Sequence, residues 1–291
     1  MTSDGVAGPA QVVVQAEIGA EAEPLIVFEG VAKSFETSSG SLHAVRDIEL
    51  VVHKAEFVTL VGPSGCGKST LLNMAAGLFA PTRGRVLYGG QVVAALNRRV
   101  GYMTQNDHLL PWRDVVGNIM VPLEIRGTPT STARDRVEQL IALVGLKGFE
   151  RAYPSQLSGG MRKRCALARV LAYDPETLLM DEPFGALDAQ LRLLMQVEIR
   201  RLALALNKTV LFVTHDLDEA VALADRCAVF TARPGTIQKI VTVPLPRDRD
   251  LLRLRRDRGY MALTAELWDL MAPQIEMIAV PSVTGSSSPR E

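Results

Sequence analysis

The sequence predicts an α/β fold built on a mainly parallel sheet. Apolar segments of strand-like composition alternate with helical stretches along most of the 291 residues. Two of these segments, EFVTLVG at 56–62 and TLLMDEP at 177–183, are nearly continuous apolar runs, as expected of strands that are buried on both faces. The alternating order then places helices on the faces of the sheet.

The expected elements follow one another at regular intervals. Strands are predicted at 25–35, 43–52, 56–62, 84–90, 99–105, 177–183, 209–215 and 226–232, with a short strand pair at 236–245. Helices are predicted at 68–78, over most of 115–150, and at 160–173, 187–206, 217–225 and 263–275. Gly127, Pro129 and Gly145 break the long helical region.

Composition narrows the function classes. Hydrophobic residues make up 47% of the chain, and the 32 Lys and Arg balance the 32 Asp and Glu, so the formal net charge is zero. This balance argues against bulk nucleic-acid binding. Cys66, Cys165 and Cys227 share no CxxC spacing, which disfavours a disulfide framework or zinc site and fits a reducing cytosol. No apolar run approaches the roughly 18 residues that span a bilayer, so any membrane role is expected to be peripheral.

The two ends of the chain differ from its middle. Residues 1–24 are rich in Ala, Gly and Glu and hold no Lys or Arg, so we expect a disordered tail and not a secretory signal. A short strand at Val12–Val14 is the alternative. Residues 246–260 interleave acids and bases, which predicts a solvated helix face or, alternatively, a contact with anionic lipid headgroups. A helical extension and a disordered tail are expected to make up 246–291.

A phosphate-binding pattern, G-x4-G-K-[ST], occurs in GPSGCGKST at 62–70. It follows a predicted strand and opens a predicted helix, where converging backbone N–H groups and the helix start attract an anion. Lys68 is expected to reach the β- and γ-phosphates of ATP, the Ser69 hydroxyl to hold Mg²⁺, and Thr70 to assist at the α-phosphate. The nucleotide-binding residues expected in this loop are Gly62, Pro63, Ser64, Gly65, Cys66, Gly67, Lys68, Ser69 and Thr70.

Cys66 lies inside this loop and allows two interpretations. One is a small residue that fills space in a tight turn. The other is a reactive thiol, because Lys68, a helix N-terminus and a nest of N–H groups all favour the thiolate and would lower its pKa. The second interpretation predicts fast labelling of Cys66 by N-ethylmaleimide and protection by Mg-ATP.

Two carboxylates follow the apolar strand at 177–183. The C-terminal end of such a strand faces the nucleotide in a parallel sheet beside a phosphate loop. Asp181 is expected to bind Mg²⁺ directly or through a water, and Glu182 to orient and polarise the attacking water. Without the phosphate loop, a solvated strand end would be the better explanation of this pair.

LSGGM at 157–161 completes a set of motifs that resembles the ABC transporter ATPase family over roughly residues 25–245. In the family's order, GPSGCGKST looks like Walker A, GYMTQ like the Q-loop, LSGGM like the signature, LLMDEP like Walker B, GALD like the D-loop and VTHD like the switch region. The resemblance implies a P-loop NTPase fold of ABC type. Such a fold has a mainly parallel sheet core, an antiparallel β-subdomain and a helical subdomain, here at about 106–155.

The resemblance also implies roles for single residues. The catalytic residues that it implies are Glu182, His215 and Gln105, and the Mg²⁺-binding residues are Ser69, Gln105 and Asp181. Signature and D-loop residues at the nucleotide would be Ser158, Gly159, Gly160 and Asp188. Phe35 in KSF stands where the family places an aromatic that stacks on adenine.

Some of these positions keep a second interpretation. An aromatic such as Phe35 is often part of the core, and a histidine after a strand, such as His215, often has a structural role. Met161 stands where the commonest signature has Gln, so a contact that requires an amide at this position would be absent.

The resemblance further implies partners. Two copies, or this chain and a second ATPase subunit, would close head-to-tail over two ATP molecules, each held between the P-loop of one and the LSGGM of the other. The helical subdomain, hinged at Gln105, would hold a groove for the coupling helix of an integral membrane permease at the cytoplasmic face of the cell membrane. A solute-binding protein would be an indirect partner, and no nucleic acid is expected.

Three functions remain within the family. The segments SQLSGGMRKRCALARVL and THDLDEAVALADR are similar to bacterial uptake systems, and LSGGM with residues 106–127 resembles the nitrate, sulfonate and taurine group. An importer ATPase that energises uptake of such a small solute is therefore favoured. The alternatives are an exporter ATPase and a non-transport ABC ATPase that acts on the ribosome or DNA.

Overall fold

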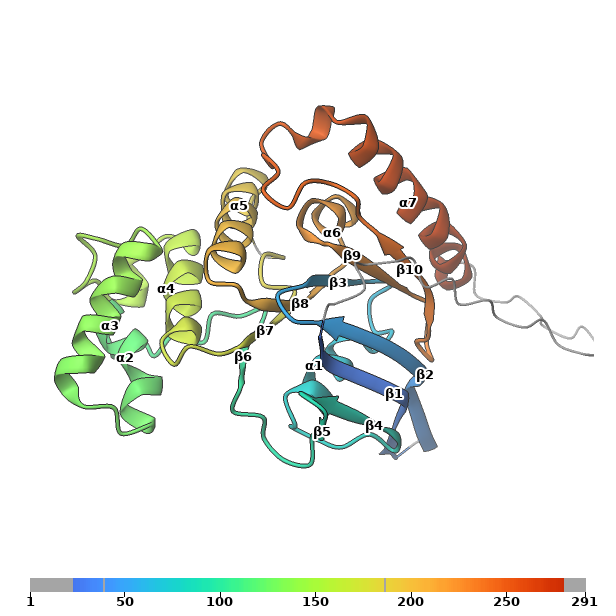
Figure 1. Ribbon diagram of the computed structural model, residues 1–291, viewed down its shortest axis with the longest axis horizontal. Helices are drawn as coiled ribbons and strands as arrows, with labels where there is room; N and C mark the ends of the chain where they lie inside the picture. The colour runs from blue at the N-terminus through green and yellow to red at the C-terminus, as the bar shows by residue number, and fades with distance from the viewer. Residues whose placement is uncertain (1–22, 39, 186, 280–291) are drawn as a thin grey trace, which may run out of the picture.

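The computed structural model describes residues 23–38, 40–185 and 187–279, which form two sheets with helices around them (Figure 1). The larger sheet has the strand order β10-β9-β3-β8-β7-β6. Its strands are β3 (Phe57–Val61), β6 (Val100–Met103), β7 (Thr177–Asp181), β8 (Thr209–Thr214), β9 (Arg226–Phe230) and β10 (Ile237–Thr242). All neighbours run parallel except β9 and β10, so the predicted mainly parallel sheet is confirmed.

The smaller sheet is antiparallel, with the strand order β2-β1-β4-β5. Its strands are β1 (Pro24–Thr37), β2 (Gly40–His53), β4 (Arg83–Tyr88) and β5 (Gln91–Val92). The two-residue strand β5 was not predicted, because a segment that short carries no periodic pattern.

The helices divide between the two sides of the larger sheet. They are α1 (Lys68–Ala75), α2 (Val115–Ile125), α3 (Thr130–Leu143), α4 (Gly159–Leu171), α5 (Ala189–Ala205), α6 (Leu217–Leu223) and α7 (Arg258–Ala279). Short 3-10 turns occur at Pro154–Gln156 and Leu254–Arg256. Figure 1 shows α5, α6 and α7 on one side of the larger sheet, α1 and the smaller sheet on the other, and α2, α3 and α4 gathered at the left.

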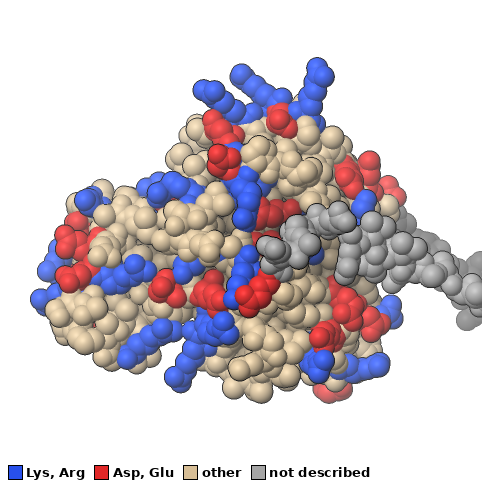
Figure 2. All heavy atoms as spheres, viewed as in Figure 1, with Lys and Arg blue, Asp and Glu red and all other residues tan. Residues whose placement is uncertain are grey.

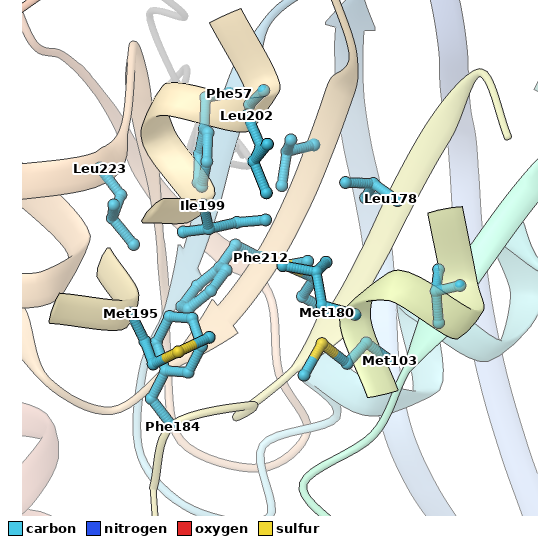
Figure 3. Close-up of a cluster of buried hydrophobic side chains, with 14 of the residues drawn as sticks. Phe57, Met103, Leu178, Met180, Phe184, Met195, Ile199, Leu202, Phe212 and Leu223 are labelled. Carbon is cyan, nitrogen blue, oxygen red and sulfur yellow. The ribbon is translucent and has the colours of Figure 1, made fainter. Parts of the chain in front are cut away.

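Two hydrophobic cores follow from the alternation of side chains along the parallel strands. In β7, Leu178 and Met180 face one core while Leu179 faces the other, and in β8 the same division separates Phe212 from Leu211. Because both faces are covered, these strands need apolar residues at successive positions. Figure 3 shows part of the larger core, where side chains from β7 and β8 meet those of α5. The continuous apolar runs of the sequence therefore reflect burial on both faces.

The surface carries both signs of charge. Figure 2 shows Lys and Arg interspersed with Asp and Glu over the visible face. This distribution agrees with the formal net charge of zero.

Two predictions near the C-terminus are wrong. Residues 236–245 contribute one strand, β10, which pairs with β9 and not with a second strand from the same segment. The helix predicted at 246–260 is absent before Arg258, where α7 begins, and although most charged residues of this segment are exposed as predicted, the side chain of Arg249 is only 2% exposed. The pattern of acids and bases at 246–260 does not show that one of its arginines, Arg249, is buried. The predicted tail at 1–24, with Val12–Val14, and the predicted tail after α7 lie almost wholly outside the described residues.

Arg249 is buried next to Asp225, and its guanidinium donates to the carbonyl oxygen of Ala224 at 2.6 Å. The Asp225 carboxylate accepts a hydrogen bond from Arg200 at 3.0 Å and from Arg247 at 2.8 Å, and Arg249 lies 3.8 Å away. It also accepts from the N–H of Phe57 at 3.0 Å, at the start of the strand that leads to the phosphate loop. Burial acts to raise the pKa of Asp225, but these positive partners outweigh it and hold the pKa below its usual range.

Asp225→Ala should lower the free energy of unfolding by about 3–5 kcal/mol, because it leaves Arg200 and Arg249 buried without a counter-charge. The Asp225 pKa is lowered on folding, so its contribution is present near neutral pH and is lost as pH falls through the folded-state pKa. The difference from wild type should therefore shrink in acid.

Chemical denaturation at pH 7 and in acid measures both effects. Arg253→Ala is the matched control, since Arg253 is 88% exposed in its pair with Asp250 and should change stability by less than about 1 kcal/mol. Equal losses in Asp225→Ala and Arg253→Ala would contradict a stabilising role for Asp225.

Candidate active site

The phosphate loop, residues 62–67, runs from the end of β3 to the first turn of α1. Gly65 and Gly67 have φ values of +74° and +102°, in the left-handed region that favours glycine. Gly67 is also closely packed, because a Cβ there would lie 2.4 Å from Cγ1 of Val45. A turn of this shape, together with the positive end of α1, forms a concavity that suits an anion.

Lys68 is folded over this loop. Its side-chain ammonium donates to the carbonyl oxygens of Gly62 at 2.7 Å and Pro63 at 2.8 Å, and the residue is 4% exposed. A phosphate is a stronger acceptor for an ammonium than a backbone carbonyl, so the cation is already placed where an anion in the loop would recruit it. Ser64 is exposed at the loop, and Thr70 is half-buried in the first turn of α1.

A second segment, the turn after β9, closes against the outside of the loop. The Nε of Arg233 donates to the carbonyl oxygen of Gly65 at 3.0 Å. A Cβ on Gly235 would lie 2.0 Å from the carbonyl oxygen of Cys66, and the N–H of Gly235 donates to the carbonyl of Ala44 at 3.0 Å. The sequence reasoning missed these contacts, because the turn carries no motif that marks it as a neighbour of the loop.

Cys66 points into the protein. Its side chain is 1% exposed, and burial raises the pKa of the thiol, with Lys68 offsetting the effect only in part. The hypothesis of an exposed, low-pKa thiol is therefore wrong, and the space-filling interpretation is supported. The electrostatic argument overlooked desolvation, which depends on side-chain direction and could not be inferred from the loop's residues alone.

Ser69, in the first turn of α1, contacts Asp181 at the end of β7. The Ser69 hydroxyl donates to Oδ1 of Asp181 at 2.8 Å, which joins α1 to the end of β7. Burial and the charge of Glu182 raise the pKa of Asp181, whereas hydrogen bonds from Ser69 and Tyr102 and the charge of Lys68 lower it. Burial dominates, so the carboxylate is poorly compensated and suits a cation.

The donor set fits Mg²⁺ bound together with phosphate. The hydroxyl of Ser69 and the carboxylate of Asp181 are hard oxygen ligands, and Mg²⁺ usually takes one or two protein ligands, keeps several waters and binds substrate phosphates. In keeping with this mode, the described residues contain no cluster of three or more His, Cys, Asp or Glu that could enclose a metal.

Glu182 and His215 face each other at the ends of β7 and β8. The Nδ1 of His215 lies 3.2 Å from Oε2 of Glu182, and their side chains are 57% and 25% exposed. Glu182 has φ +44°, an uncommon conformation for a residue with a Cβ, and its N–H donates to the carbonyl of Val213 at 3.1 Å. Backbone strain of this kind concentrates at functional sites and persists where the surroundings enforce it.

The side chain of Gln105 lies near that of Glu182. A Cβ on Gly185 would lie 3.3 Å from Nε2 of Gln105 and 4.0 Å from Oε2 of Glu182, so both side chains border this glycine. The backbone carbonyl of Gln105 accepts a hydrogen bond from the buried Lys163 of α4. Lys163 was not predicted, although it lies close to the signature in sequence.

The signature residues begin α4 and lie apart from the phosphate loop of their own chain (Figure 1). Ser158 caps the helix, with its Oγ accepting from the N–H of Met161 at 3.3 Å. A Cβ on Gly160 would lie 2.4 Å from the Leu191 side chain, so this glycine allows α4 to approach α5 closely, and Gly159 precedes it in the first turn. Met161 is partly buried and packs against the larger core.

Asp188 and Phe35 have local contacts. Asp188 caps α5, because its Oδ1 accepts from the N–H of Leu191 at 2.9 Å. The half-buried ring of Phe35 meets Phe79 edge-on at 5.6 Å, with the Lys33 ammonium 5.3 Å from its centroid. These contacts give Asp188 and Phe35 a structural role within this chain. A contact of either residue with a nucleotide is a proposal.

Comparisons with known proteins agree with this geometry. A sequence profile of the family described as ABC transporter matches residues 45–185. An uncharacterized ABC transporter ATP-binding protein of Methanocaldococcus jannaschii is 49% identical over 222 residues, which cover 76% of this chain and 83% of that protein. The chain belongs to the family of ABC transporter ATP-binding proteins.

Other ABC ATPases extend the comparison. The aliphatic sulfonates import ATP-binding protein of Bacillus licheniformis is 43% identical over 217 residues, or 75% of this chain and 84% of that protein. A dimeric ATP-binding cassette in a post-hydrolysis state with ADP and Pi has a TM-score of 0.67 and 28% identity, and the match covers 76% of this chain and all of the cassette. The predicted P-loop fold of ABC type is thus confirmed. This ABC ATPase carries a nucleotide-binding domain that binds and hydrolyses ATP.

Lys68→Ala should weaken ATP binding by about tenfold to a hundredfold, because a hydrogen bond to a charged group contributes about 1.5–3 kcal/mol. Calorimetric titration with ATP measures the change. Lys54→Ala removes the same charge from an exposed pair with Glu23 and should leave the affinity unchanged. An unaltered ATP affinity in Lys68→Ala would exclude this ammonium from the phosphate site.

Cys66 should react slowly with N-ethylmaleimide in the native, nucleotide-free protein, because its thiol is buried and its pKa is raised. Burial raises the pKa of Cys165 and of Cys227 to about 12, so these thiols should also be slow. Labelling followed by mass spectrometry, with the denatured protein as control for full reactivity, tests this. Rapid native labelling of Cys66 that Mg-ATP prevents would reinstate the reactive thiol.

Proposed function

We propose that this chain is the ATP-hydrolysing subunit of an importer, which energises uptake of a small solute of the nitrate, sulfonate or taurine class through a separate permease. The observation that carries the ATP-hydrolysing part of the proposal is the presence of two side-chain pairs, Ser69 with Asp181 and Glu182 with His215, beside the phosphate loop. Ser69 and Asp181 offer oxygen ligands for Mg²⁺ beside the phosphates. Glu182 and His215 offer groups that can bind the attacking water and the γ-phosphate.

The residues divide the chemistry between them. The loop N–H groups and the Lys68 ammonium would bind the β- and γ-phosphates, and Ser69, Asp181 and Gln105 would hold Mg²⁺. When bound, Mg²⁺ would supply positive charge that neutralises negative charge as it develops on the phosphates. Glu182 accepts a hydrogen bond from the attacking water and polarises it. With Nδ1 of His215 turned towards Glu182, Nε2 is the ring nitrogen that we assign to the γ-phosphate.

A second cassette completes the site. Ser158, Gly159 and Gly160 lie apart from the phosphate loop of their own chain (Figure 1). In the proposed head-to-tail dimer they and Asp188 of one subunit approach the ATP that is bound to the other, and the N-terminus of α4 offers N–H groups to the γ-phosphate. The dimeric states of the solved structural neighbours support this arrangement. The second cassette is another copy of this chain or a related ATPase subunit.

The permease contact is proposed for the surface between α2 and α3. A cavity of about 930 Å³ opens there, with apolar Met120, Val137 and Ile141 among charged residues such as Arg134 and Glu138. An apolar floor with a mixed charged rim suits a short amphipathic helix at the cytoplasmic face of the membrane. No helix among the described residues is long and apolar enough to cross a bilayer.

The importer class is favoured by the named relatives. Sulfonate import ATPases of Bacillus species are 38–43% identical to this chain, alongside uncharacterized ABC proteins at 41–49%. The equal numbers of Lys plus Arg and Asp plus Glu argue against a nucleic-acid partner. Reconstitution with a permease and a solute-binding protein tests the class, since only an importer accumulates solute on the side of the ATPase.

Glu182→Gln should reduce ATP turnover by about 10²–10⁴-fold, because the amide keeps the shape of the carboxylate but cannot accept the proton. ATP affinity should be retained, so the variant should accumulate as a dimer with Mg-ATP. Phosphate release and light scattering measure the two properties. Glu266→Gln, at an exposed pair with Lys239, is the control and should turn over normally. A Glu182→Gln variant that hydrolyses ATP at the wild-type rate would overturn the assignment.

A further inference from the structure

Three buried polar side chains form a hydrogen-bonded network that begins at the residue before His215. Thr214, at the end of β8, is 2% exposed, Glu219 of α6 is 5% exposed, and Gln196 of α5 is 8% exposed. A buried carboxylate in an otherwise apolar interior requires hydrogen-bond partners.

Each oxygen of the Glu219 carboxylate has a partner. Oε2 accepts from the hydroxyl of Thr214 at 2.5 Å, and Oε1 accepts from the side-chain amide of Gln196 at 3.0 Å. The Thr214 hydroxyl in turn accepts from the N–H of Asp216 at 3.0 Å. The hydroxyl oxygen of Thr214 therefore links both neighbours of His215, Thr214 and Asp216, to Glu219.

Asp216 adds two further attachments. Its Oδ1 accepts from the N–H of Glu219 at 3.1 Å and caps α6, and its Oδ2 accepts from Arg192 of α5 at 3.2 Å. The segment that carries His215 is thus fixed to α6 and, at two points, to α5.

His215 needs such support from its backbone. Its side chain is 57% exposed, so packing does little to orient the imidazole. Its distance to Glu182 depends instead on where the backbone at 214–216 lies. A shift of about 1 Å in a catalytic group can lower a rate about a hundredfold.

We propose that Glu219 is a positioning residue for ATP hydrolysis, which acts through the Thr214 hydroxyl to hold His215 against Glu182. The inference rests on the proposed role of His215 at the γ-phosphate. The competing explanation is a buried polar network that only stabilises the fold.

Thr214→Val tests the proposal with a change of one atom, because valine keeps the shape and removes the hydroxyl. We expect kcat to fall at least about tenfold while the dissociation constant for ATP stays within about twofold, since the network contacts no nucleotide-binding residue other than through His215. Thr214→Ser retains the hydroxyl and should recover most of the rate. Glu219→Gln, whose amide can still accept from Thr214, should lose less than Glu219→Leu.

Thr209→Val is the matched control. Thr209 starts the same strand, is 1% exposed, and its hydroxyl accepts from the N–H of Ala55 at 2.9 Å. This variant should lose comparable stability without the loss in kcat. Thermal unfolding of all variants, with kinetics recorded well below the transitions, separates stability from rate.

A double-mutant cycle with His215→Ala decides between the explanations. If the Thr214 hydroxyl acts by positioning His215, Thr214→Val should cause no further loss of kcat in the His215→Ala background. A full wild-type kcat in Thr214→Val, or an equal loss with and without His215, would overturn the proposal. Failure of the proposed function itself would appear separately, as normal turnover in both Glu182→Gln and His215→Ala.

Discussion

The register of three parallel strands is the constraint on which the site depends. β8 lies between β3 and β7, with Val61 opposite Thr214 and Asp181 opposite Val213. The phosphate loop and His215 follow the last residues of β3 and β8, and the carboxylate pair begins at the last residue of β7, so the strand pairing brings all three to one edge of the sheet. A slip of one residue would reverse the faces of the strand and exchange the two cores, which makes the register strongly determined by burial.

The two hydrophobic cores that cover the faces of the larger sheet fix the positions of polar groups at its edge, even where those groups are partly shielded from water. The Lys68 ammonium is buried, the Asp181 carboxylate is partly buried and its pKa is raised, and Glu182 has a backbone conformation that few residues with a Cβ adopt. Each of these groups is prepared to interact with an anion, a cation or a water, and backbone strain like that of Glu182 concentrates at functional sites. Further along the sheet, Asp225 fixes the start of β3 and the segment around Arg249.

Much of this arrangement could be predicted from the sequence. Continuous apolar runs located the buried strands, and the Gly-rich loop and the Asp-Glu pair could be assigned because their chemistry depends on residue type and on position at a strand end. The burial of Cys66 and of Arg249 could not be predicted, since it depends on side-chain direction and on partners distant in sequence. Glu219 was overlooked for a similar reason: its partners Thr214 and Gln196 lie on two other elements, and a glutamate in an amphipathic helix is usually exposed.

The contacts of α4 indicate how the helices α2, α3 and α4 are connected to Gln105, which lies near Glu182. Lys163 donates to the carbonyl of Gln105, and Arg169 donates to the carbonyls of Asp107 and His108 at 2.6 and 2.7 Å. The backbone that follows β6 is therefore held by the same helix that begins with the signature residues. A displacement of α4 moves Gln105 with it, because stretching hydrogen bonds from buried or charged donors is unfavourable. One helix thus connects two parts of the proposed site: its N-terminus carries Ser158 and Gly160, and its basic side chains hold the backbone of Gln105, whose side chain lies near Glu182.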